Sequence, residues 1–106
     1  MNAWVMLVIA GLLEIGWALG LKATEGFTRP IPTVFTVAAL VASLLLLARA
    51  VQVLPMGTAY AIWVGIGASG TVLFGILLYG ESVSVLKIAS LAAVLLGIAG
   101  LKLSAA

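Results

Sequence analysis

The sequence contains no cysteine, no histidine and no aspartate, and only 8% of its 106 residues are charged. Without cysteine the chain forms no disulfide bond. Without histidine it lacks the most common metal ligand and the side chain that usually carries protons near neutral pH. Proton chemistry therefore falls to the 3 glutamates or to lysine and tyrosine. The 5 basic residues are scattered along the chain, so we expect no nucleic-acid partner.

Enzyme motifs are missing too. The sequence has no nucleophile–base pair, no phosphate-binding loop and no metal-ligand cluster, so we expect neither an enzyme nor a bound cofactor or metal. Hydrophobic residues make up 65% of the chain. So few charged groups cannot cover the surface of a soluble domain, and most of the outside must therefore meet lipid. We expect the first apolar segment to remain in the mature protein, because no basic residue precedes it.

Charges, prolines and glycines divide the apolar sequence into segments long enough to cross a bilayer as helices. The expected spans are 3–21, 32–49, 58–79 and 86–103. The stretches between them are too short for another domain. The fold class predicted is therefore an all-α membrane protein, with one four-helix transmembrane domain over residues 1–106.

The distribution of basic residues gives almost no signal for orientation. An even number of spans places both termini on one side, together with Arg49 and Lys102. The other side holds Lys22, Arg29 and Lys87. Because the excess of Lys and Arg sets topology, a difference of one residue predicts insertion in both orientations. A weak preference for one orientation is the alternative.

The last span offers a surface for a second copy of the chain. Ala89, Ala93 and Gly97 recur every four residues, and small residues at this spacing let two helices approach closely in a membrane. Four short helices have little room to enclose a polar pathway alone, so we expect a homodimer. The alternative is that alanine and glycine are simply abundant here.

Glu14 is the most informative residue, because it lies near the middle of the first span. A charged side chain there costs about 2.5–3.5 kcal/mol on insertion scales. A carboxylate in this position holds a proton or pairs with a cation, which is what an exchange of one for the other requires. The alternative is a protonated glutamate that only hydrogen-bonds a neighbouring helix.

Hydroxyl, phenol and indole groups are expected around this carboxylate, and small residues leave space beside it. The candidate site residues are Trp17, Ser43, Tyr60 and Trp63, with Gly65 and Gly67 allowing a bend or a close contact in the third span. Aromatic faces attract cations, and indole N–H groups donate to carboxylates. For Tyr60 and Trp63 the alternative is a plain interfacial belt.

Three longer motifs run along the chain, and the first two contain all of these residues except Ser43. They are Gly11-x-x-Glu14-x-x-Trp17-Ala18, Leu54-Pro55-x-Gly57-Thr58-Ala59-Tyr60-Ala61-Ile62-Trp63-x-Gly65-Ile66-Gly67, and Gly97-Ile98-x-Gly100-Leu101-Lys102. Together they resemble the small multidrug resistance family over essentially the whole chain. Trp17 and the ending at Lys102 resemble its guanidinium-exporting branch. Val64 departs from that branch, which commonly has threonine or serine there.

The resemblance implies an antiparallel homodimer in a bacterial inner membrane, in which the paired Glu14 side chains bind substrate and protons in turn. It implies that Trp17, Ser43 and Trp63 hydrogen-bond to that carboxylate and that Tyr60 lines the path as a switch. It places Gly65 and Gly67 at a bend, and the fourth span at the dimer contact.

The function expected is proton-coupled export of guanidinium and related small cations by alternating access. Export of quaternary ammonium or other drug cations is the alternative within transport. A non-transporting membrane assembly subunit and a passive cation channel are the alternatives from other classes.

Overall fold

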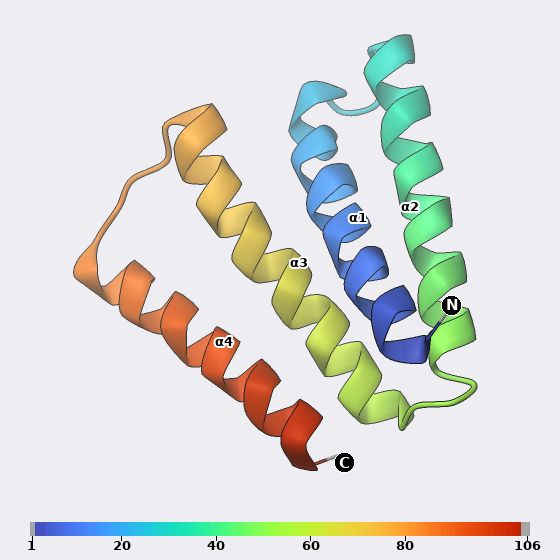
Figure 1. The fold of residues 1–106 in the computed structure, drawn as a ribbon. Coiled ribbons are helices and arrows are strands. Elements are labelled where there is room, and N and C mark those ends of the chain that lie inside the picture. Colours follow the sequence, from blue (N-terminus) through green and yellow to red (C-terminus); the bar gives the residue numbers. More distant parts are fainter. Residues whose placement is uncertain (1, 105–106) are drawn as a thin grey trace.

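A computed structural model describes residues 2–104, and these form four helices joined by short turns (Figure 1). The helices are α1 (Ala3–Ala23), α2 (Pro30–Ala50), α3 (Met56–Tyr79) and α4 (Val85–Ser104). Each is long and apolar enough to cross a membrane. The all-α membrane fold predicted from the sequence is therefore confirmed. The helices overlap all four expected spans and extend them by up to two residues at either end.

The helices lie side by side in the order α2, α1, α3, α4 (Figure 1). Within the described residues, α1 packs on both α2 and α3, whereas the backbone of α4 comes close to that of α3 alone. The molecule measures 42 × 35 × 18 Å. Because one helix with its side chains is about 10–12 Å across, a thickness of 18 Å leaves no room for an enclosed channel. A single chain is thus a slab with two open faces.

Local sequence signals fix the ends of the helices. The Asn2 side chain accepts a hydrogen bond from the Trp4 amide at 2.7 Å, which caps α1. Proline is the first residue of α2, where its missing N–H group is not needed. Gly80 ends α3 with a φ of +64°, a left-handed conformation that glycine adopts without strain.

The hydrophobic core lies between α1, α2 and α3, in the half of the slab that contains the chain termini. Its buried members are Leu7, Ala10, Leu47, Ala50, Ala59, Ile62 and Trp63. By contrast, Leu91 is the buried residue of α4. The slab is therefore held together around α1, and most of α4 is left exposed.

The start of α1 and the end of α4 lie at the same end of the slab (Figure 1). Arg49 lies at the end of α2 there, and Lys102 near the end of α4. Lys22, Arg29 and Lys87 lie at the opposite end, close to the turns at 24–29 and 80–84. This arrangement agrees with the division of basic residues expected from the sequence.

Candidate functional site

Glu14 lies halfway along α1, about two helical turns from the buried core residue Leu7. Its side chain is half-buried. The Oε1 atom is fully covered, yet it has no hydrogen-bond partner among residues 2–104. Buried polar atoms almost always have a partner in native structures, and an exception points to a functional role or to a group still to be bound. Glu14 is therefore the first candidate for a binding residue.

Gly67 of α3 makes room for this carboxyl group. A Cβ atom built on Gly67 would overlap Oε1, Cδ and Cγ of Glu14. The carboxyl group thus lies against the bare backbone of α3, where any other residue would displace it. Here the glycine serves close packing, which is one of the two roles expected for it from the sequence.

A cleft of about 360 Å³ opens beside the carboxyl group, between α1 and α3. Its lining residues are Glu14, Trp17, Ala18, Val64, Gly67, Ala68, Thr71 and Val72. Two more of its polar atoms, Trp17 Nε1 and Thr71 Oγ1, are buried without a hydrogen-bond partner in the described part of the chain. Three residues that line the cleft therefore each carry a buried polar atom without a partner: a carboxyl oxygen, an indole N–H and a hydroxyl. The cleft can accept a small cation at its carboxylate.

Ser43 and Trp63 contact α1 one turn before Glu14. The Ser43 hydroxyl donates to the carbonyl oxygen of Ala10 at 2.7 Å, and Trp63 Nε1 donates to Ser43 Oγ at 3.1 Å and to the same carbonyl at 3.3 Å. The intrahelical partner of that carbonyl is the backbone amide of Glu14. In this structure the two side chains therefore fix the backbone that carries Glu14. Their expected hydrogen bonds to its carboxylate stay a prediction.

Tyr60 and Gly65 occupy other places along α3. Tyr60 is half-exposed, and its ring centre lies 5.7 Å from that of Trp63 at an interplanar angle of 46°. Gly65 is buried against the Ile98 side chain of α4. Gly65 and Gly67 lie within one uninterrupted helix here, so the bend also stays a prediction.

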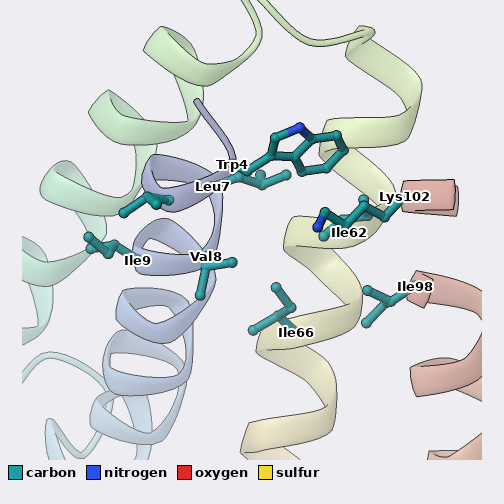
Figure 2. A pocket seen from close by; sticks show the side chains of 9 residues that line it. Trp4, Leu7, Val8, Ile9, Ile62, Ile66, Ile98 and Lys102 are labelled. Atoms are coloured by element: carbon teal, nitrogen blue, oxygen red, sulfur yellow. The ribbon is translucent and has the colours of Figure 1, made fainter. Parts of the chain in front are cut away.

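A second groove lies among α1, α3 and α4, nearer the termini (Figure 2). It has a volume of about 330 Å³, and aliphatic side chains such as Val8 and Ile66 line most of it. Lys102 lies at its edge with Nζ 5.5 Å from the centre of the Trp4 ring. The described residues that line this groove include an ammonium group and no carboxylate, so it is not suited to a cation.

A protein family and several known proteins are similar to this chain. The model of the Small Multidrug Resistance protein family matches residues 2–95. The guanidinium exporter of Escherichia coli K12 is 58% identical over 102 residues, which cover 96% of this chain and 97% of that protein. The guanidinium exporters of Yersinia pestis and Proteus vulgaris are 57% and 53% identical, again over 96% of this chain and 98% of theirs.

The chain belongs to the small multidrug resistance family.

In this member of the small multidrug resistance family, two groups near Glu14 were not predicted from the sequence. One is the Ala10 carbonyl, which no sequence pattern marks because every residue has one. The other is Thr71, which follows Gly67 by four residues and therefore lies on the same face of α3. That spacing was visible in the sequence. Val64, one turn before Gly67, lines the same cleft and presents only methyl groups to it.

Proposed function

We propose that this protein exports guanidinium and related small guanidinyl cations across a bacterial inner membrane in exchange for protons. The observation that carries the proposal is the Glu14 carboxyl group, placed in mid-membrane at an open cleft with Oε1 unpaired among the described residues. The guanidinium exporters of three bacteria share more than half of this sequence and support the choice of substrate.

The chemistry of the cleft fits a guanidinium ion. Guanidinium is planar and presents N–H donors in a fork that matches a carboxylate. Trp17 contributes an indole N–H, which donates but cannot accept. Such a donor is suited to holding the Glu14 carboxylate in position while the cation binds its other oxygen. The bulky Trp17 side chain also forms part of the cleft wall, which favours small cations over bulky aromatic ones.

The transporting unit is an antiparallel homodimer. The slab of a single chain has no room for an enclosed path, and its cleft is open. Ala89, Ala93 and Gly97 of α4 are all exposed, with nothing within 4 Å of the position that a Gly97 Cβ would take. A second α4 fits against this row. The nearly even basic charge at the two ends supports opposite insertion of the two chains.

In such a dimer, one Glu14 from each chain brackets the cation, and protons compete with the cation for the same pair. The two carboxylates then titrate as a coupled unit. A dimer loaded with cation or protons reorients between the two sides, whereas an empty pair, which carries two charges into the membrane, does not. This rule couples each exported cation to the entry of up to two protons. Tyr60, exposed on α3, lines the path and acts as the switch.

The test is a measurement of transient currents on a solid-supported membrane that carries the purified protein. Adding guanidinium is expected to give a current with the wild type and none with Glu14→Gln, because the amide keeps the shape and loses the charge. A current with a quaternary ammonium ion but none with guanidinium would overturn the substrate. Unaltered guanidinium currents in Glu14→Gln would overturn the role of the carboxylate.

A further inference from the structure

Thr71 carries a hydroxyl that the structure leaves unused. In helices a threonine hydroxyl commonly bonds the backbone carbonyl three or four residues earlier. Thr33 does this in α2, where its hydroxyl donates to the Arg29 carbonyl at 2.6 Å. Thr71 Oγ1 is buried and makes no such bond to any residue that the structure describes. Its hydroxyl is therefore free to bond another group.

The position of Thr71 points to the cation site. Thr71 lines the cleft between α1 and α3 that Glu14 and Trp17 also line. Gly67, against which the Glu14 carboxyl group packs, lies one turn earlier on the same face of α3. Rotation about the single χ1 bond exchanges the hydroxyl and the methyl group of threonine, so the hydroxyl can turn toward the cleft without backbone movement.

A guanidinium ion needs a hydrogen-bond acceptor that this hydroxyl can provide. The ion presents N–H donors on all three of its edges and has no acceptor. Two Glu14 carboxylates accept from two edges, and the donors on the third edge then need another acceptor. A donor buried without a partner weakens binding substantially. Trp17 Nε1 only donates, and the remaining side chains that line the cleft, apart from Thr71 and Glu14, are apolar.

We propose that Thr71 is a substrate-binding residue whose hydroxyl accepts a hydrogen bond from the N–H groups of guanidinium that the paired carboxylates leave unmatched. The inference rests on the proposed function, because it assumes that a guanidinium ion occupies the cleft. The cleft has a valine at position 64, one turn before Gly67, and its hydroxyl lies one turn after, at Thr71.

The experiment uses Thr71→Val, which replaces the hydroxyl with a methyl group of nearly the same size. Solid-supported membrane currents are recorded over a series of guanidinium concentrations in the wild type and the variant. The apparent KM is expected to rise about tenfold, since a hydrogen bond to a charged group is worth roughly that factor. The maximum current and the temperature of thermal unfolding in detergent are expected to stay unchanged.

Two further variants make the result specific. Thr71→Ser keeps the hydroxyl and is expected to restore the wild-type KM. Ser69→Ala removes another buried, unpaired hydroxyl from α3, but Ser69 lines a different cavity, between α3 and α4. Its KM is expected to match that of the wild type.

The outcomes separate the two proposals. Wild-type currents with an unchanged KM in Thr71→Val would overturn the role of Thr71 and leave guanidinium export standing. The same holds if Ser69→Ala raises the KM as much as Thr71→Val does, or if Thr71→Ser fails to restore it. A wild type with neither binding nor transport of guanidinium would overturn the export proposal, and the assignment of Thr71 with it.

Discussion

Replacing Gly67 with alanine places a methyl group where the Glu14 side chain now lies. A Cβ atom at this position would lie 2.6 Å from Glu14 Cγ and closer still to Cδ and Oε1, whereas ordinary contacts begin near 3.4 Å. The glutamate side chain must therefore move by about 1 Å, and a displacement of that size at a reacting or binding group costs about a hundredfold in rate. We expect Gly67→Ala to lower guanidinium transport by about that factor.

The folded state of this variant is expected to survive, because the atoms that meet the new methyl group belong to the flexible side chain of Glu14. Gly57→Ala is the matched control. Gly57 lies on the same helix, and a Cβ atom there would meet nothing within 4 Å. The assay compares initial guanidinium uptake into proteoliposomes, together with the thermal unfolding temperature in detergent. If Gly67→Ala transports as well as Gly57→Ala, the reasoning from close packing at Glu14 is refuted.

Two further predictions concern packing and assembly. Ser43→Ala is expected to lower the free energy of unfolding by about 1 kcal/mol, because it removes the bond to the Ala10 carbonyl and one of the two acceptors of Trp63 Nε1. Denaturation in SDS followed by circular dichroism measures this loss. An unchanged denaturation midpoint would contradict the prediction. Gly97→Leu is expected to leave the helices of one chain intact, since nothing within the described residues lies near that position, but to turn the dimer into a monomer. Single-molecule photobleaching in liposomes counts the subunits, and dimers that persist in Gly97→Leu would show that α4 is not the contact.

The sequence predicted the four helices because membrane spans leave a strong signal. A long apolar run in the bilayer must form a helix, because only then is every backbone N–H and C=O group hydrogen-bonded without water. Charges and prolines such as Arg29 and Pro55 mark the breaks between them. The helix ends were less well defined: α2 begins at Pro30, within the stretch expected to be a turn, because proline is favoured in the first turn of a helix.

The candidate site was predictable in part. Glu14 was selected as a candidate because an ionisable group in mid-membrane is costly and rare. A close contact at Gly67 was one of two options, and only the relative position of α1 and α3 shows that its partner is Glu14. Ser43 and Trp63 were expected to bond the Glu14 carboxylate, and that stays a prediction; the bonds that they make to the Ala10 carbonyl depend on three-dimensional packing. A backbone acceptor carries no sequence signal.

Proton coupling through Glu14 is the central claim, and it is tested most directly by enclosing a pH-sensitive dye in proteoliposomes. An outward gradient of guanidinium, with no membrane potential, is expected to drive protons inward through the wild type and acidify the interior. Glu14→Gln is expected to leave the interior pH unchanged under the same gradient. Acidification by Glu14→Gln at the wild-type rate, or guanidinium efflux through the wild type without any proton movement, would contradict the account.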